Sequence, residues 1–518
     1  MSRAIVFNDI VAPNINYYML APVLVVLGGA VLSVLIEAFY PRESRRTAQV
    51  SLTLTTLVVA FLAVLNIKAD SILGFSIVQS LAIDGVSVFL QGLILLAAFV
   101  GALLISENRI DPLGDTFASQ ASALPGSEDE QKFTERRWYQ TEVWPLFLFS
   151  VGGMLIFPIA NDLLTLFVAL EVMSLPLYLL AGMARRRRLL SQEAALKYFV
   201  LGAFSSAFML YGASLVYGFA NSVVYGDIAK ALESTTANSN LILIGSIFIL
   251  VGLLFKIGAV PFHQWTPDVY QGSPTAITAF MGAATKVAAF GALLRIFYVA
   301  FGTLTWDLSA ILWTIAIATM LVGTIVGVAQ SDIKRMLAYS SIAHAGFLLL
   351  GVIAQSKSAL DGSLFYLVSY AFTTLGTFAV VSLVRDSSGE ANHLGQWAGL
   401  GKRSPLVASV FALFLLALAG IPLTSGFVGK FAVFAAAYDA NLSPLVVVAV
   451  ISSAIAGFFY VRVIVLMFFT DSTGDEVSVV VPSFATSAAI TISAVMTIAL
   501  GVMPQPVFDL LATALLLK

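Results

Sequence analysis

The 518-residue sequence contains no cysteine, only three histidines and few charged residues, which make up 11% of the chain. Without cysteine, the chain forms no disulfide, uses no thiolate in catalysis and cannot ligate zinc or an iron–sulfur cluster through sulfur. The histidines, His263, His344 and His393, are too far apart in the sequence to indicate a histidine-rich metal centre. We therefore expect no cofactor in this chain.

A surplus of basic residues is also lacking, because 27 Lys and Arg stand against 29 Asp and Glu. Such a balance cannot neutralise many phosphates, so nucleic-acid binding is not expected. Apolar residues are abundant instead, at 59% of the chain with 38 Phe. A soluble globular protein has about 45–50% apolar and about 25% charged residues. The composition therefore predicts a membrane protein that lies within the lipid bilayer.

Long apolar runs, separated by charges or by Gly and Pro, predict an all-α polytopic protein with about 14 transmembrane helices of about 20 residues each. The predicted spans are 18–39, 47–66, 84–106, 141–159, 162–183, 194–220, 240–268, 273–298, 309–329, 336–355, 361–385, 405–438, 443–470 and 483–502. The first apolar run has little basic charge before it and no evident cleavage site. We expect it to be a retained helix and not a signal peptide.

The charges of the connections orient the chain, because Lys and Arg accumulate on the cytoplasmic side. Alternate connections hold sixteen basic residues, namely Arg42, Arg45, Arg46, Arg109, Lys132, Arg136, Arg137, Arg185, Arg186, Arg187, Arg188, Lys334, Arg335, Arg385, Lys402 and Arg403. The other side has five, namely Arg3, Lys68, Lys230, Lys357 and Lys518. This asymmetry predicts both termini outside a bacterial plasma membrane, and a flexible acidic cytoplasmic loop at 107–140.

Two of the predicted spans contain helix-breaking residues. Gly258 and Pro261 follow Lys256 in span 240–268, and Gly420 and Pro422 precede Lys430 in span 405–438. Proline removes a helical hydrogen bond, and backbone groups freed at membrane depth are tolerated only inside protein or along a cavity.

Each broken span is fourth in a group of five, and five crossings would invert the second group relative to the first. This pattern predicts two inverted five-helix repeats, as in transporters whose broken helices mark the transport site. The predicted organisation is 1–140 (three helices and the acidic loop), 141–300 (first repeat), 301–472 (second repeat) and 473–518 (a last helix).

Four ionisable residues lie well inside predicted spans: Glu171, Lys256, Lys286 and Lys430. Each costs about 2.5–3.5 kcal/mol on membrane-insertion scales, so a functional role is the default interpretation. A buried lysine that gains and loses a carboxylate partner changes its affinity for a proton. Clustered carboxylates or carbonyls would instead indicate a metal cation. We therefore expect these four residues to move protons.

Other polar residues in the spans are more ambiguous. Lys197 is near a helix end, where its flexible side chain could reach the interface. His344 is near the middle of its span but could be a hydrogen-bonded core histidine. For Arg295 and Arg462, which lie nearer span ends, packing or lipid contact is favoured.

Four stretches give the chain a family resemblance. They are the segment of Glu171, LEVMSLPLYLL; LLFKIGAVPFHQWTPDVYQGSPTAITAFM at 253–281; QSDIKRMLAYSSIAHAGF at 330–347; and LAGIPLTSGFVGKF at 418–431. Together they resemble the antiporter-like membrane subunits of proton-pumping NADH:quinone oxidoreductase, respiratory complex I. Within that group, WTPDVYQGSPT is most similar to subunit N (subunit 2).

This resemblance implies a coupled ion pair of Glu171 and Lys256, a central relay at Lys286 and a terminal titratable group at Lys430. It makes Lys197, His344 and Lys334 supporting positions. It also implies that flavin, iron–sulfur clusters and quinone are held by partner subunits, and that this chain contacts other membrane subunits of the complex.

Three alternatives stay open at this point. The chain could belong to a multisubunit Na⁺/H⁺ antiporter, although the WTPDVYQG variant argues against it. It could belong to a complex I relative that takes electrons from another donor. It could also be a structural spacer between active modules.

Overall fold

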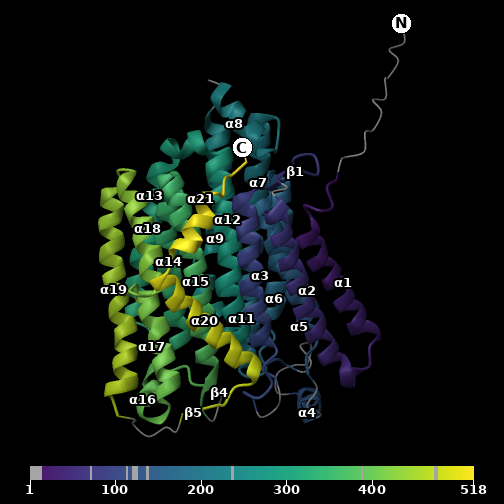
Figure 1. Cartoon of the computed structure of the whole chain (residues 1–518), viewed down its shortest axis with the longest axis vertical. Coiled ribbons are helices and arrows are strands. Elements are labelled where there is room, and N and C mark those ends of the chain that lie inside the picture. The colour runs from purple at the N-terminus through teal and green to yellow at the C-terminus, as the bar shows by residue number, and fades with distance from the viewer. Residues whose placement is uncertain are drawn as a thin grey trace.

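The computed structural model describes residues 15–70, 73–111, 115–118, 127–135, 139–234, 239–386, 389–471 and 477–517. Over these residues the chain is a bundle of long helices, with α1 and α2 at one edge and α19 at the other (Figure 1). The helices are α1 (Ala21–Phe39), α2 (Arg42–Asp70), α3 (Gly85–Ile105), α4 (Glu128–Glu135), α5 (Val143–Ile156), α6 (Leu163–Ala181), α7 (Arg188–Ala220), α8 (Tyr225–Ser234), α9 (Ser239–Ile257), α10 (Trp265–Gly272), α11 (Thr275–Phe280), α12 (Lys286–Arg295), α13 (Thr305–Val328), α14 (Ile333–Ala354), α15 (Lys357–Leu383), α16 (Leu400–Arg403), α17 (Pro405–Ala419), α18 (Ser425–Asp439), α19 (Ser443–Phe469), α20 (Phe484–Val502) and α21 (Gln505–Ala512).

Shorter elements join these helices. Two π-helical turns, η2 (Met281–Thr285) and η3 (Ile296–Ala300), flank α12, and the 3-10 turns are η1 (Phe157–Ile159), η4 (Gly302–Leu304) and η5 (Leu394–Trp397). One antiparallel sheet pairs β1 (Gly74–Ser76) with β2 (Leu81–Ile83), and another has the order β4 (Gly389–Glu390), β3 (Val384–Asp386), β5 (Ser478–Val479).

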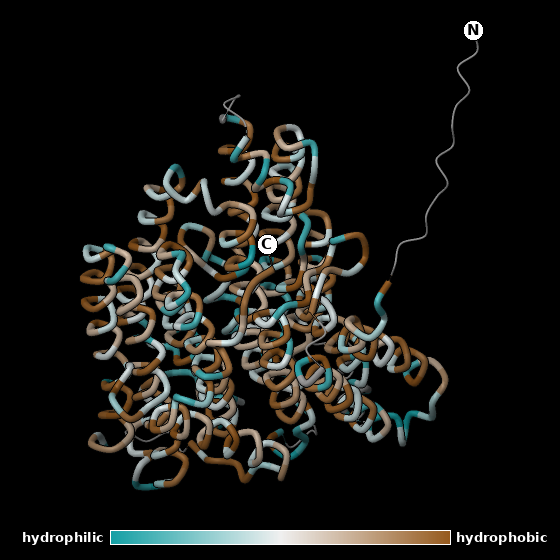
Figure 2. Tube along the Cα trace, turned by 45° about the horizontal axis from the view of Figure 1, so that its top comes forward, coloured by the Kyte–Doolittle hydropathy of each residue, from teal (hydrophilic) through white to brown (hydrophobic). Residues whose placement is uncertain are grey.

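The predicted all-α membrane architecture is confirmed. Among the described residues, 12 helices are long and apolar enough to cross a membrane. Two shorter apolar helices, Val143–Ile159 and Pro405–Ala419, coincide with the fourth and twelfth predicted spans. Each of the remaining predicted spans also coincides with a helix. Figure 2 shows the apolar character along these helices, with hydrophilic residues mainly in their connections.

Both predicted helix breaks are present. The helix α9 ends at Ile257, and Gly258 then adopts a left-handed backbone with φ +73°. The helix α17 ends at Ala419, and Gly420 likewise has φ +84°. Only glycine takes this conformation without steric cost, so both breaks are encoded by local sequence.

The centre of the bundle is formed by α11, α12, α14 and α15, whose residues are almost all buried, whereas α1, α2, α19 and α20 leave much of their apolar surface exposed. The last of these, α20, packs across α3, α15, α17 and α18, and so joins the N-terminal helices to the C-terminal half. The buried central helices carry Lys286 and His344, which places these residues far from lipid.

Of the two roles expected for Arg295, packing is the one that the structure shows. The side chain is buried, and its Nη2 atom donates to both carboxylate oxygens of Asp84 at 2.9 and 2.8 Å. Its Nε atom donates to the carbonyl of Pro158 at 2.7 Å. Asp84 also caps α3, so this ion pair fixes α3 against α12. Arg462 has a packing role, donating to the carbonyls of Val328 and Gln330 at the end of α13.

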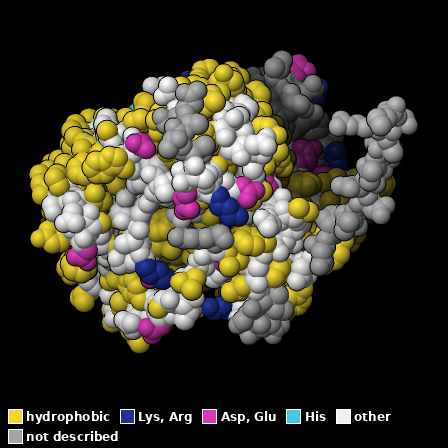
Figure 3. Space-filling model, turned by 90° about the horizontal axis from the view of Figure 1, so that it is seen from above, with side chains coloured by type: hydrophobic (Ala, Val, Ile, Leu, Met, Phe, Trp, Pro, Cys, Tyr) yellow, Lys and Arg dark blue, Asp and Glu magenta, His cyan; other side chains and the backbone are white. Residues whose placement is uncertain are grey.

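The two ends of the bundle differ in their elements. Helix α8 lies at the upper end in Figure 1, whereas α4, α16 and the strands β4 and β5 lie at the lower end. Figure 3 looks onto the upper end, where Lys, Arg, Asp and Glu are scattered among apolar and neutral polar residues.

Candidate functional site

Lys256 occupies an aromatic cage in the first half of the bundle. Its Nζ atom donates to the Tyr198 hydroxyl at 3.1 Å and lies 5.0 and 5.6 Å from the ring centres of Tyr198 and Tyr178. Aromatic faces attract a cation at this distance. The Tyr198 ring stacks at 4.5 Å on Trp265, the first residue of α10 beyond the break. The broken helix thus completes the cage around the lysine that precedes it.

Glu171 lies on α6, two helical turns before Tyr178. Its Oε1 atom is buried and accepts no hydrogen bond in the described structure. Lys256 and Glu171 form no direct ion pair among the described residues, and Tyr178 connects them only indirectly, through its place on α6 and its ring against Lys256. A buried polar atom without a partner calls for a physical explanation, of which a functional role is one.

Lys286 follows the π-helical turn η2 in the middle of the bundle. Such turns insert an extra residue into a helix and are frequent at functional sites. Its Nζ atom donates to the backbone carbonyl of Ser341 on α14 and lies 5.5 Å from the ring centre of Tyr370. The Tyr370 hydroxyl donates to Ser341 Oγ at 2.8 Å, and the Tyr270 hydroxyl is 3.3 Å from the same oxygen. Lys286 therefore borders a hydroxyl cluster made by three helices.

His344 lies one helical turn beyond Ser341 on α14. Its Nδ1 atom is 2.6 Å from the Tyr366 hydroxyl, and its Nε2 atom is 3.3 Å from the Tyr460 hydroxyl. The imidazole also packs against Tyr370, with ring centres 5.2 Å apart. It is hydrogen-bonded in the core, as the structural alternative supposed, but both partners are hydroxyl groups able to donate or accept a proton. The histidine thus extends the hydroxyl cluster into the second half.

Lys430 is held by the second broken helix. Its Nζ atom donates to the carbonyls of Leu418 and Ala419, both at 2.9 Å, and to Ser453 Oγ at 3.0 Å. The backbone position that would bond Leu418 in a continuous helix is Pro422, which has no N–H. The lysine therefore occupies carbonyls that the break sets free. The ring centre of Phe347, on the helix of His344, lies 5.1 Å away.

Lys256, Lys286, His344 and Lys430, with their hydroxyl partners, form a row of polar residues through the bundle. Lys197 and Lys334 lie outside this row. Lys197 is partly exposed and pairs with Glu193 and Asp268, both at 2.7 Å, and Asp268 also binds Arg335 at 2.7 Å. This network joins α7, α10 and α14. Lys197 is thus fixed by acidic partners.

Lys334 is buried in a polar cluster at the start of α14. Its Nζ atom donates to the Ser273 carbonyl, Thr275 Oγ1 and Glu390 Oε2, at 3.0, 2.9 and 3.2 Å. Burial opposes ionisation of Glu390, but Lys334 and the Thr275 hydroxyl outweigh it and hold the pKa of that carboxyl below its usual value. The Glu390 carboxyl is therefore ionised at neutral pH.

The hydroxyl groups that lie between the charged residues were not predicted from the sequence. They are Tyr178, Tyr198, Tyr270, Ser341, Tyr366, Tyr370 and Tyr460. A tyrosine in an apolar span carries no charge and is common in cores, so it does not stand out. The one local signal is the spacing of Tyr366 and Tyr370, which lie one turn apart in a single predicted span.

The described residues include no group of three or more His, Asp or Glu side chains placed to hold a metal ion. What the site offers chemically is a row of lysines, one histidine and hydroxyl groups across the middle of the bundle. Such groups bind and pass protons.

Comparisons with known proteins show the family to which the chain is similar. The family model described as "NADH:quinone oxidoreductase/Mrp antiporter, TM" matches residues 160–456. A NADH-quinone oxidoreductase subunit N from Rhodococcus opacus is 57% identical, over 96% of each chain. Another, named subunit N 3, from Streptomyces griseus is 55% identical, over 98% of this chain and 95% of the relative. The similarity therefore extends over nearly the whole length.

Solved structures show the same similarity. A chain of respiratory complex I from Thermus thermophilus matches with a TM-score of 0.76 and 31% identity, over 95% of this chain and 100% of that chain. A chain of the Mrp complex from Dietzia matches with a TM-score of 0.77 over 95% of this chain and 96% of that one, but at 22% identity. The second likeness establishes the shared fold only.

Proposed function

Since this chain belongs to the subunit N family of NADH-quinone oxidoreductase, we propose that its row of buried lysines carries protons across the membrane while electrons pass from NADH to quinone in other subunits of complex I. The chain is a membrane subunit of that oxidoreductase, and its partners are other membrane subunits of the complex.

The observation that carries this proposal is the continuity of the row. The Lys256 cage ends at Trp265, whose ring is 6.5 Å from that of Tyr270. The Tyr270 hydroxyl then meets Ser341, which Lys286 and Tyr370 also contact. His344 and its tyrosine partners continue toward Phe347, beside Lys430. One aromatic ring lies at each of the two links without a hydrogen bond: Trp265 between Tyr198 and Tyr270, and Phe347 between His344 and Lys430.

In this proposal Glu171 supplies the change of charge that drives the transfer. Its unpaired Oε1 atom lies on the helix of Tyr178, one wall of the Lys256 cage. A negative Glu171 favours the protonated form of Lys256, and a neutral Glu171 allows that proton to leave toward Lys286. In this proposal Lys197 and Lys334 stabilise the positions of the helices that carry the residues of the row.

The redox chemistry belongs to other subunits in this account. Iron–sulfur clusters need cysteine ligands, which this chain does not have. We place NADH oxidation, flavin, these clusters and the quinone site in partner subunits.

The orientation follows from the basic residues. The lower end in Figure 1 carries α16, with Lys402 and Arg403, and the connection with Arg186 and Arg187. Lys and Arg prefer the cytoplasmic side, so we place this end in the cytoplasm of a bacterial cell, with both termini outside. Arg3, Arg136, Arg137 and Lys518 lie outside the described residues, as does part of the acidic loop at 107–140.

We also propose that α5–α12 and α13–α19 are inverted repeats. In the first unit, the glycine Gly153 of α5 packs against the backbone of Met173 on α6. In the second, Gly323 of α13 packs in the same way against Ala343 on α14. The first two helices of each unit thus share a close backbone contact, and the broken helix follows at the fourth position in both.

The test is the variant Lys256→Ala in the assembled complex. NADH oxidation with an artificial electron acceptor should stay near the unsubstituted rate, whereas coupled quinone reduction or proton pumping should fall. Lys230→Ala is the matched control, because Lys230 is exposed on α8, far from the row. An unchanged number of protons per NADH, at unchanged quinone reduction, would contradict the proposal.

A further inference from the structure

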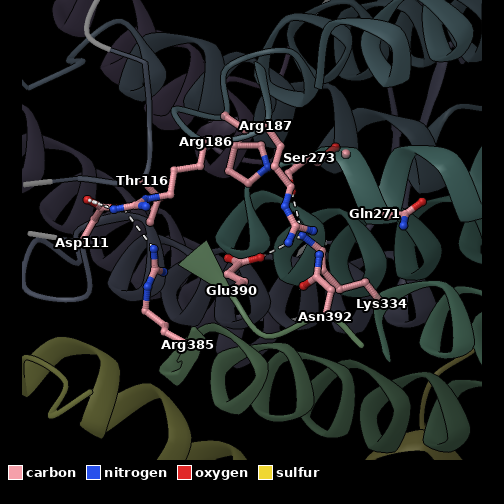
Figure 4. A pocket seen from close by; sticks show the side chains of 13 residues that line it. Asp111, Thr116, Arg186, Arg187, Gln271, Ser273, Lys334, Arg385, Glu390 and Asn392 are labelled. Atoms are coloured by element: carbon pink, nitrogen blue, oxygen red, sulfur yellow. Dashed lines mark hydrogen bonds and ion pairs between the residues drawn. The ribbon is translucent and has the colours of Figure 1, made fainter. Parts of the chain in front are cut away.

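A polar cavity lies at the lower end of the bundle, where connections from both halves meet (Figure 4). It encloses about 50 Å³, several times the space that one water molecule needs. Arg186 and Arg187 reach it from the connection before α7, Lys334 from the start of α14, and Arg385 from β3. In Figure 4, Asp111, Arg186 and Arg385 lie on one side of the cavity, and Lys334 and Asn392 on the other.

The acidic residues of this cavity are already engaged. Asp111 accepts from Arg186 Nε at 2.7 Å and from Arg385 Nη2 at 3.0 Å. Glu390 pairs with Lys334 and Thr275. Four basic residues and two acidic ones line the cavity, so the lining has a surplus of two positive charges. Asp386 lies outside the lining, binds Gln396 and also interacts with Arg186 and Arg385, which leaves a surplus of one positive charge when it is included.

Three buried polar atoms of the lining lack a partner in the described structure. They are Arg385 Nη1, Ser273 Oγ and Asn392 Oδ1. All three side chains are more than nine-tenths buried, with 6%, 2% and 6% of their surface exposed. A buried guanidinium nitrogen without an acceptor is costly. The Asn392 amide can turn to present its NH₂ group, and the Ser273 hydroxyl can donate.

The ligand that fits is a tetrahedral oxyanion. Guanidinium groups bind phosphate oxygens in a forked, charge-assisted geometry, and hydroxyl and amide donors complete such sites. Water alone would satisfy the unpaired atoms but would not balance the surplus of charge. A phosphate group has several acceptor oxygens for the unpaired atoms and at least one negative charge to balance the surplus.

We propose that this cavity binds a phosphate group, supplied either by inorganic phosphate or by the headgroup of an anionic phospholipid. Arg187 and Arg385 hold the anion, and Ser273 and Asn392 complete its hydrogen bonds. A bound phosphate ties the connections of the two halves together at the end where Lys334 and Glu390 pair. This inference does not depend on the proposed proton path.

The test uses the purified complex with Arg187→Gln in this chain. Arg187 is exposed, so we expect its substitution to leave the fold intact. The control is Lys402→Gln, which removes an exposed base from the same end, where it binds Asp471. Arg187→Lys keeps the charge but not the forked geometry.

Two arms distinguish the source of the phosphate. In the first, complex freed of phospholipid is titrated with radiolabelled inorganic phosphate in a chloride background. In the second, native mass spectrometry counts the phosphatidylglycerol molecules retained after mild delipidation. Arg187→Gln should weaken binding by about tenfold or more in one of the arms, because a charge-assisted hydrogen bond is lost, with Arg187→Lys intermediate and Lys402→Gln unchanged.

A loss in the first arm identifies free phosphate as the source, and a loss in the second identifies the lipid headgroup. Equal binding by Arg187→Gln and the unsubstituted complex in both arms would overturn the proposal. Absence of binding in both arms would overturn it as well.

Discussion

Lys256 and Lys430 lie beside the two broken helices, but the structure holds them differently. Lys256 precedes its break and makes one hydrogen bond, to Tyr198, within a cage of aromatic rings. Lys430 follows its break and makes three, of which two go to carbonyls that the break sets free.

The two helix breaks therefore hold their lysines in different ways. After the first break, Trp265 packs against the aromatic cage. Lys256 makes one hydrogen bond, fewer than the three that its ammonium group can donate. At the second break the backbone itself binds the lysine. We therefore propose that the charge of Lys256 depends on the carboxylate of Glu171, whereas backbone carbonyls support the charge of Lys430.

The largest expected effect comes from replacing each lysine by methionine. Both variants should lose coupled activity, but only Lys430→Met should also destabilise the protein, because it strands two buried carbonyls at about 1–3 kcal/mol each. Lys256→Met removes a poorly compensated buried charge, so stability should be unchanged or higher. Thermal inactivation of the purified complexes measures this. Equal destabilisation by the two variants would show that the freed carbonyls do not distinguish Lys430 from Lys256.

The glycines of the breaks give the next effect. Alanine at either position costs about 1–2 kcal/mol, because both have left-handed backbones. A Cβ at Gly420 would lie 2.9 Å from Lys430 Cδ, whereas at Gly258 it would lie 2.8 Å from the Thr266 hydroxyl. We expect Gly420→Ala to lower coupled quinone reduction more than Gly258→Ala, at similar thermal stability. The reverse order of rates would show that Lys430 tolerates displacement.

Single hydroxyl groups should matter less, and unequally. Tyr198→Phe removes the one hydrogen bond of Lys256 but keeps the ring, whereas Ser453→Ala removes one of three from Lys430. The rate of coupled quinone reduction should therefore fall further with Tyr198→Phe, by up to about tenfold for one hydrogen bond of about 1.4 kcal/mol. A larger loss with Ser453→Ala would mean that the carbonyls do not hold Lys430.

Lys334 differs from both Lys256 and Lys430, because it has a direct carboxylate partner, Glu390. The pKa of Glu390 is below its usual value, so its ion pair stabilises the fold above about pH 4.5, and this contribution disappears as the pH falls through the lowered pKa. Glu390→Gln should reduce thermal stability at pH 7, and the difference from the unsubstituted complex should shrink under acidic conditions. A difference independent of pH would contradict this assignment.

The sequence was sufficient for the spans, the two breaks and the placement of Lys256, Lys286 and Lys430 inside the bundle, because each is a local signal. Gly258 and Gly420 interrupt apolar runs, and a lysine in such a run is conspicuous by its cost. The ion pair of Arg295 and Asp84 joins residues 211 positions apart, so it could not be read locally. The hydroxyl partners of Lys286 and His344 come from helices that only the tertiary structure brings together, and the same is true of the phosphate cavity.

In the proposed path, protons pass along the row, and Lys286 lies between its first and second halves. The direct measurement is the number of protons moved per NADH oxidised by the complex in proteoliposomes, with Lys286→Met compared with Lys230→Ala. We expect fewer protons per NADH for Lys286→Met, with NADH oxidation by an artificial acceptor unchanged in both variants. A ratio equal to that of the unsubstituted complex would contradict it.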